Sequence, residues 1–122
     1  MSFTLVIDDN RQTADALCQI LKLFGFTTRQ VLGPSAAMAV LTTDIPQFIT
    51  LDLNMPGVNG FEVLGYLKRE PRLMNVPVIV ITSDDQPETA KQAITLGASA
   101  IMIKPVMPDL LEATLRKIGL LQ

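Results

Sequence analysis

A carboxylate stands at the end of an apolar segment near the middle of the chain. Residues 48–60 read FITLDLNMPGVNG, so Asp52 follows an apolar run and a Pro/Gly/Asn turn comes directly after it. Strand interiors are depleted in Asp, and an unpaired carboxylate among apolar residues carries a desolvation cost. Asp52 is therefore a candidate reactive or metal-binding group that needs partners from elsewhere in the chain.

Three other apolar runs also end in polar residues. These are Asp8 and Asp9 after residues 5–7, Thr82 and Ser83 after residues 78–81, and Lys104 after residues 100–103. The carboxyl ends of parallel strands lie along one edge of a sheet, where such sheets place their sites. If all these runs are parallel strands, three acids, a hydroxyl and an ammonium converge on one site.

The elements that must position these groups follow a strand-then-helix pattern repeated five times. Strands are predicted over residues 3–7, 27–31, 47–51, 76–81 and 100–103. Helices are predicted after each strand, with Gly25, Pro71 and Gly97 ending the first, third and fourth. In the fourth helix, Ala93 and Ile94 are expected to face inward. The pattern predicts a doubly wound α/β fold, with a five-stranded parallel sheet and helices on both faces.

Asp9 has two possible roles. The segment from Asp9 to Gln12, DNRQ, matches a capping box, which would make Asp9 the N-cap of the first helix. A cap needs only one acid, however, whereas a divalent-cation site gains from two. Because Asp8 stands beside Asp9, we favour a metal site at this position.

The composition sets broad limits on the class of protein. The chain has 122 residues, a net charge of −2 and no run of basic residues, so we expect no nucleic-acid binding by this chain. It has no His and a single cysteine, Cys18, which excludes a His/Cys zinc site and an internal disulfide. No apolar run is long enough to span a membrane and no export signal is visible, so we expect a cytoplasmic protein.

In order and spacing, these motifs resemble the receiver domain of two-component response regulators. The matching motifs are DD at 8–9, DLNMPGVNG at 52–60, TS at 82–83 and KP at 104–105. The resemblance covers essentially the whole chain, so a single receiver domain is expected over residues 1–122, with no output domain. It also implies the flavodoxin-like strand order 2-1-3-4-5 and a cis peptide bond before Pro105.

The resemblance assigns a role to each polar position. Asp52 would be the phospho-acceptor, forming an acyl phosphate, and Thr82 and Lys104 would contact the phosphoryl group. Three close carboxylates need a cation, and Mg²⁺ suits their oxygen atoms. By resemblance, Asp9 and Asp52 would bind Mg²⁺ directly, Asp8 through water, and Asn54 through its backbone carbonyl. Asn54 and Asp84 also lie where family members tune hydrolysis of the acyl phosphate.

The same resemblance implies a signalling partner on each side and no turnover of external substrates. The phosphoryl donor would be a histidine kinase or a histidine phosphotransfer protein, docking near Arg11, Ala14 and Asp15. Phosphorylation would alter the surface of the fourth helix, fifth strand and fifth helix, which binds a downstream protein target. We expect a monomer or a weak, phosphorylation-dependent dimer.

Two positions depart from the family pattern. Ile101 replaces the usual switch aromatic, and Val106 replaces a frequent Phe. These departures leave the expected fold and phosphorylation chemistry intact but remove the aromatic part of the family's switch. Ile101, Met102 and Leu110 could belong either to the core or to an apolar interface.

Other function classes remain open. A binding module that is never phosphorylated would keep the same fold. An aspartate-nucleophile phosphatase would carry Asp-x-Asp after the first strand, whereas here Leu53 and Asn54 follow Asp52 on the third. A flavin-binding relative would need a hydroxyl-rich or Gly-rich first loop, but residues 8–13 are acidic.

Overall fold

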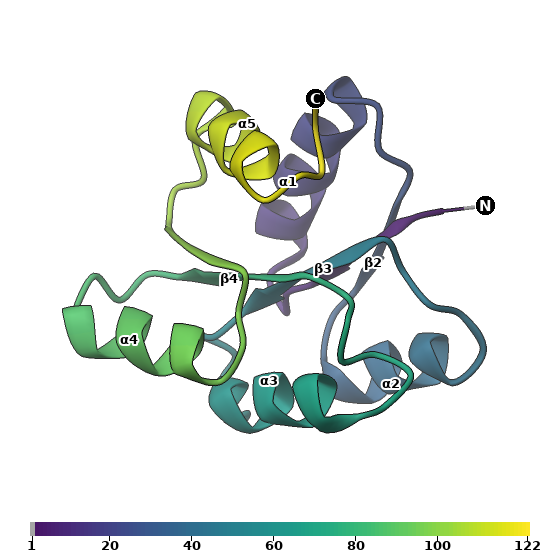
Figure 1. The fold of residues 1–122 in the computed structure, drawn as a ribbon, viewed down its shortest axis with the longest axis vertical. Coiled ribbons are helices and arrows are strands. Elements are labelled where there is room, and N and C mark those ends of the chain that lie inside the picture. The colour runs from purple at the N-terminus through teal and green to yellow at the C-terminus, as the bar shows by residue number, and fades with distance from the viewer. Residues whose placement is uncertain (1) are drawn as a thin grey trace.

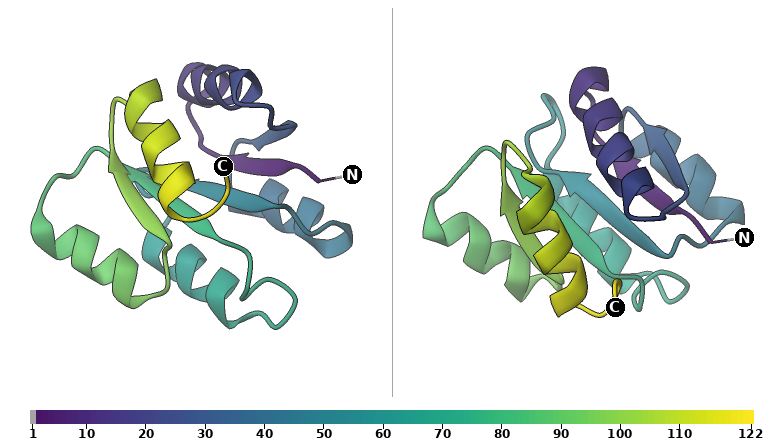
Figure 2. Two further views of the ribbon diagram at one scale, coloured as in Figure 1. Left: turned by 45° about the horizontal axis from the view of Figure 1, so that its top comes forward. Right: turned by 90° about the horizontal axis from the view of Figure 1, so that it is seen from above.

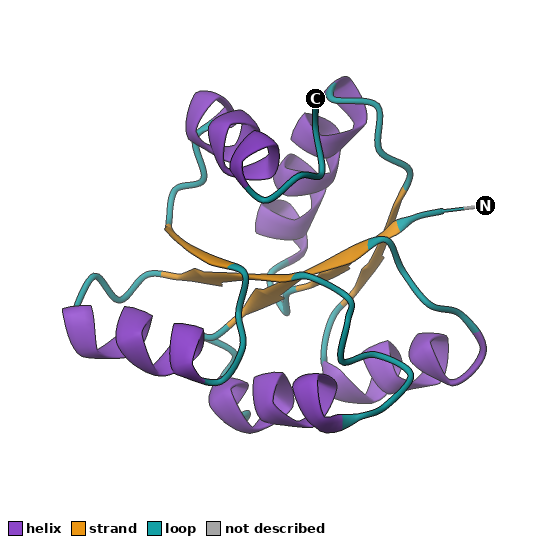
Figure 3. Cartoon of the chain, viewed as in Figure 1, coloured by secondary structure: helices purple, strands orange, loops and turns teal. Residues whose placement is uncertain are grey.

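A parallel sheet of five strands separates two layers of helices (Figures 1 and 3) in the computed structural model, which describes residues 2–122. The strands are β1 (Thr4–Ile7), β2 (Thr28–Val31), β3 (Phe48–Asp52), β4 (Val78–Thr82) and β5 (Ala100–Ile103). All pairs are parallel and the order is β2-β1-β3-β4-β5. The predicted fold class and strand order are therefore confirmed.

Helices cover both faces of this sheet. They are α1 (Arg11–Leu23), α2 (Pro34–Thr43), α3 (Gly60–Arg69), α4 (Pro87–Thr95) and α5 (Pro108–Lys117). Helices α1 and α5 lie on one face, and α2, α3 and α4 lie on the other (Figures 1 and 2). Within residues 2–122, no helix has the length and apolar character needed to cross a membrane.

The three central strands are buried along their whole length, because helices shield both sheet faces from water. Every residue of β1, β3 and β4 is buried, whereas the edge strands β2 and β5 are partly exposed. Alternating side chains of the same strands supply two separate cores. Leu51 packs on the face of α2, α3 and α4, and Phe48 packs on the face of α1 and α5.

A close backbone approach fixes the turn after β3. A Cβ atom on Gly60 would lie 2.6 Å from Leu53 Cδ2 and 2.9 Å from Leu53 Cα, closer than real Cβ atoms come. Glycine is therefore required where α3 begins beneath the end of β3. Asn59 caps this helix, and its Oδ1 accepts hydrogen bonds from the N–H groups of Phe61 and Glu62.

One alternative left open in the sequence is now excluded, and one local prediction was wrong. The N-cap of α1 is Asn10, whose Oδ1 accepts from Thr13 N at 3.0 Å, so Asp9 does not cap this helix. Ile94 of α4 is 50% exposed instead of facing the core. Helix α4 buries only Ala93 completely, because it covers the edge of the sheet and presents a narrower face to it.

Two threonine hydroxyls are buried without a hydrogen-bond partner. Thr4 and Thr50 are at most 1% exposed, and no polar atom in the described part of the chain pairs with their Oγ1 atoms. An unpaired buried hydroxyl costs free energy because it has lost water and gained nothing in return.

We expect Thr50→Val to raise the free energy of unfolding by about 1 kcal/mol, since it removes the unpaired hydroxyl and keeps the shape of the side chain. Urea unfolding followed by circular dichroism measures the change. Thr82→Val is the matched comparison, because that hydroxyl is hydrogen-bonded and its loss should destabilise the fold. A Thr50→Val protein less stable than the wild type would contradict the analysis.

Candidate functional site

Strand register brings three carboxylates together at one end of the sheet. Ile7 pairs with Leu51, so the next residues, Asp8 and Asp52, lie side by side. Asp8 and Asp52 are buried, Asp9 is exposed, and each offers an oxygen such that all three oxygens lie within 4.8 Å of one another. The sheet therefore places like charges close together, partly out of water.

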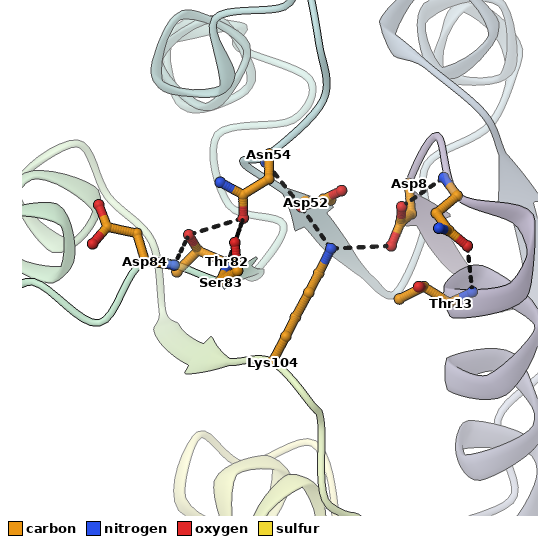
Figure 4. Close-up of polar contacts among 9 residues, drawn as sticks. Asp8, Thr13, Asp52, Asn54, Thr82, Ser83, Asp84 and Lys104 are labelled. Carbon is orange, nitrogen blue, oxygen red and sulfur yellow. Dashed lines mark hydrogen bonds and ion pairs between the residues drawn. The ribbon is translucent and has the colours of Figure 1, made fainter.

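Lys104 supplies one positive charge to this cluster. Its Nζ lies 3.2 Å from Asp52 Oδ1 and 3.9 Å from Asp8 Oδ2, and its side chain is 23% exposed (Figure 4). The residue sits just past β5, where its N–H donates to the carbonyl of Thr82. The Lys104–Pro105 peptide bond is cis, as the resemblance implied. One ammonium cannot balance three carboxylates, so the cluster keeps an excess of negative charge.

The pKa of Asp8 is raised to about 6. The main cause is burial, which disfavours the charged carboxylate, and the negative charge of Asp52 adds to it. A hydrogen bond from Asn10 N to Asp8 Oδ1, at 2.9 Å, and the charge of Lys104 act in the opposite direction. The charged form of the Asp8 carboxylate is thus disfavoured, and a nearby cation would stabilise it.

The donor set fits a hard divalent cation. Carboxylate oxygens from three residues are the kind of ligand that Mg²⁺ takes, and Lys104 leaves part of their charge uncompensated. Since Asn10 caps α1, the carboxylate of Asp9 is also not needed by the helix.

A hydrogen-bond network joins the loop after β3 to the loop after β4. Asn54 N donates to Asp52 Oδ1 at 2.9 Å, and Thr82 Oγ1 donates to Asn54 Oδ1 at 3.1 Å. Ser83 donates to the same Asn54 oxygen through its N–H, at 2.6 Å, and through its hydroxyl, at 3.1 Å. Sequence reasoning missed this role of the Asn54 side chain, because residues 54 and 83 are far apart in the chain and no motif links them.

Asp84 ties the second loop to α4. Its Oδ1 accepts from Gln86 N at 2.9 Å and its Oδ2 accepts from Thr89 Oγ1 at 2.5 Å. These hydrogen bonds lower the pKa of Asp84, and the hydrogen bond from Thr89 has the larger effect. Asp84 N in turn donates to Thr82 Oγ1 at 3.0 Å. The buried hydroxyl of Thr82 is therefore connected both to Asn54 and to the start of α4.

A cavity of about 490 Å³ opens beside Asp52, between α1 and the segment that follows β5. Most of its lining is apolar, including Leu17, Ile20 and Val106, and its charged lining residues are Asp8, Asp52 and Lys104. Asp52 therefore lines a cavity on the side of the sheet that α1 covers.

The chain is similar to a family model, to curated proteins and to solved structures. The family model described as response regulator receiver domain matches residues 4–116. Protein RcaC of Microchaete diplosiphon is 31% identical over 102 residues, which are 84% of this chain and 16% of that protein. The chain spans half or less of the length of the first curated relatives that it matches.

Two solved structures are similar over almost the whole chain. The signal receiver domain of a DNA binding response regulator from Colwellia psychrerythraea 34H is 29% identical, with a TM-score of 0.89, and 97% of this chain and 98% of that chain are covered. A response regulator from Burkholderia pseudomallei, solved with a phosphorylated aspartic acid, a calcium ion and citrate, is 28% identical. Its TM-score is 0.83, and 94% of this chain and 66% of that chain are covered.

We expect Asp8→Asn to stabilise the metal-free protein by roughly 1–2 kcal/mol at pH 7.5, because it removes one buried like charge. The pKa of Asp8 is about 6 in the folded protein, above its ordinary value of 3.8, so ionisation of Asp8 opposes folding. This penalty is complete above about pH 6 and disappears as the pH falls toward 4.

Unfolding in urea with a chelator present, at pH 7.5 and at pH 4.5, measures both effects. The stability difference between Asp8→Asn and wild type should be clearly smaller at pH 4.5. An equal gain at both pH values would mean that the charge of Asp8 is not its source.

Proposed function

Because this chain belongs to the response regulator receiver family, we propose that Asp52 accepts a phosphoryl group from a phosphohistidine. The donor would be a histidine kinase or a histidine phosphotransfer protein. The observation that carries the proposal is the placement of Asp52: a buried carboxylate at a strand end, 3.2 Å from an ammonium and close to two further acids. The related structure from Burkholderia pseudomallei holds a phosphorylated aspartic acid, which supports the same chemistry here.

The reaction is a transfer between two nucleophiles. A carboxylate oxygen of Asp52 attacks phosphorus, the bond from phosphorus to the donor imidazole nitrogen breaks, and the imidazole leaves and takes up a proton. Asp52 Oδ1 is already engaged by Asn54 N and by Lys104 Nζ, so we assign the attack to Oδ2. Lys104 holds the carboxylate in place and offers its charge to the incoming phosphoryl oxygens.

Asp8, Asp9, Asp52 and the backbone carbonyl of Asn54 would hold Mg²⁺, which would neutralise charge on the phosphoryl group during transfer. The close carboxylates and the raised pKa of Asp8 support this assignment.

The new phosphoryl group would change the outer surface through Thr82 and Lys104. The Thr82 hydroxyl would donate to a phosphoryl oxygen, and the loop of residues 82–88 would follow, which shifts α4. Several exposed apolar side chains mark the surface of α4, β5 and α5 where a downstream protein would bind: Ile94, Ile103, Met107 and Leu110. Of the residues left open in the sequence, Met102 lies in the core and Leu110 on this surface.

Docking of the phosphoryl donor would use the start of α1 and the segment after Lys104, which border the cavity beside Asp52. Arg11 and Asp15 are exposed there, but Ala14 is fully buried and the prediction for it was wrong. The family is a signalling family, so we propose no turnover of external substrates. A cytoplasmic location and a monomer or weak dimer remain proposals.

Incubation with a small-molecule phosphodonor should add one phosphoryl group, detected by intact mass, only when Mg²⁺ is present. The Asp52→Asn variant should gain none, because an amide does not form the acyl phosphate. Modification that persists in Asp52→Asn would show that another residue is the acceptor. A wild-type protein that is never modified would favour the binding module, and steady turnover of an aryl phosphate would favour a phosphatase.

Thr82→Ala should still be phosphorylated on Asp52, since the hydroxyl is not the nucleophile, but α4 should respond less. Backbone amide chemical shifts of α4 in the phosphorylated protein measure the response. We expect the shift changes at Ala90 and Ala93 to fall to less than about half of those in the wild type. Equal changes in both proteins would rule out the coupling through Thr82.

A further inference from the structure

Asn54 accepts three hydrogen bonds on one side-chain oxygen from the last residue of β4 and the residue that follows it. The donors are Thr82 Oγ1, Ser83 N and Ser83 Oγ, at 3.1, 2.6 and 3.1 Å (Figure 4). A backbone N–H can only donate, so the atom that faces Ser83 N must be the amide oxygen. The orientation of the Asn54 amide is thereby fixed, with its oxygen turned toward the loop.

The same residue is bonded to the proposed phospho-acceptor. Asn54 N donates to Asp52 Oδ1 at 2.9 Å, so one residue contacts Asp52 through its backbone and the β4–α4 loop through its side chain. The loop in turn reaches α4, because Asp84 N donates to Thr82 Oγ1 and the Asp84 carboxylate accepts from Thr89 Oγ1. The connection from Asp52 to α4 is continuous through hydrogen bonds.

The Thr82 hydroxyl has a single proton to donate. In this structure that proton points to Asn54 Oδ1, while the Thr82 oxygen accepts from Asp84 N. A phosphoryl oxygen on Asp52 and the amide oxygen of Asn54 would therefore compete for the same proton. Thr82 is fully buried, so water does not readily replace either acceptor.

We propose that Asn54 is a positioning residue whose amide oxygen holds Thr82 and Ser83 in place in the unmodified protein, and that phosphorylation of Asp52 must displace the Thr82–Asn54 hydrogen bond. Asn54 thus opposes the movement of Thr82 toward Asp52 until a phosphoryl group, a stronger and charged acceptor, is present. The inference rests on the proposed phosphorylation of Asp52 and adds a residue that sets the resting state. If Asn54 served only to form its own turn, its side chain would affect neither Ser83 nor the affinity for a phosphoryl analogue.

The first test uses the unmodified, metal-free protein. Water exchange of the Ser83 amide, measured by NMR, should be about tenfold faster in Asn54→Ala than in the wild type, because its acceptor is gone. Asn54→Asp keeps an oxygen in the same place and should restore slow exchange. Asn59→Ala is the matched control, since it also removes an asparagine that accepts backbone hydrogen bonds, but at α3. Unchanged exchange at Ser83 in Asn54→Ala would overturn the proposal.

The second test measures competition with the phosphoryl analogue beryllofluoride in the presence of Mg²⁺. Asn54→Ala should bind it at least about threefold more tightly than the wild type, since Thr82 is then free to donate. In a Thr82→Ala background the same substitution should have no such effect. An equal gain in both backgrounds, or no gain in either, would overturn the competition. If the wild type binds no analogue at all, the proposed phosphorylation of Asp52 fails, and the Ser83 exchange result alone decides whether Asn54 holds the loop.

Discussion

The site depends on two buried carboxylates that lie next to each other with one ammonium between them. Asp8 and Asp52 are 3% and 2% exposed, and Lys104 reaches both from the end of β5, which β4 separates from β3. Removing carboxylates from water and placing them side by side is unfavourable unless opposite charges and hydrogen bonds compensate. The ion pairs with Lys104 and the N–H groups of Asn10 and Asn54 supply part of this compensation. The remaining excess of negative charge is what equips the site to attract a divalent cation.

The parallel sheet makes this arrangement possible. Strands β1, β3 and β4 are buried on both faces and paired in register, so the residues after them are held at nearly fixed spacing. The two apolar cores above and below the sheet provide the stability that can offset a destabilising cluster. The stable sheet thus tolerates the unfavourable electrostatics at the carboxyl ends of its strands.

Hydrogen bonds to the Asn54 side chain join the loops after β3 and β4. Asn54 lies between them and is exposed, yet it accepts hydrogen bonds from a buried hydroxyl and a backbone N–H. Loops are less constrained than strands, and a small number of hydrogen bonds can decide which conformation they adopt. Asp52 is bonded directly to Asn54 N, whereas the two cores beneath the loops are mainly apolar. The structure therefore separates a rigid sheet from loops that can respond.

The sequence by itself determined the fold class, the strand order through the family resemblance, and the polar residues at each strand end. It could do so because apolar runs and helix signals are local, and because all parallel strands end at the same edge. It left Asp9 open as a possible cap of α1 beside the favoured metal site, whereas the cap is Asn10, since both residues can cap a helix and only backbone geometry distinguishes them. It also placed Ile94 inside, because helical spacing does not show how much of a helix the sheet edge can cover. Only the tertiary structure decided that the Asn54 side chain bonds to Thr82 and Ser83, since that contact joins segments 28 and 29 residues apart through the geometry of two loops.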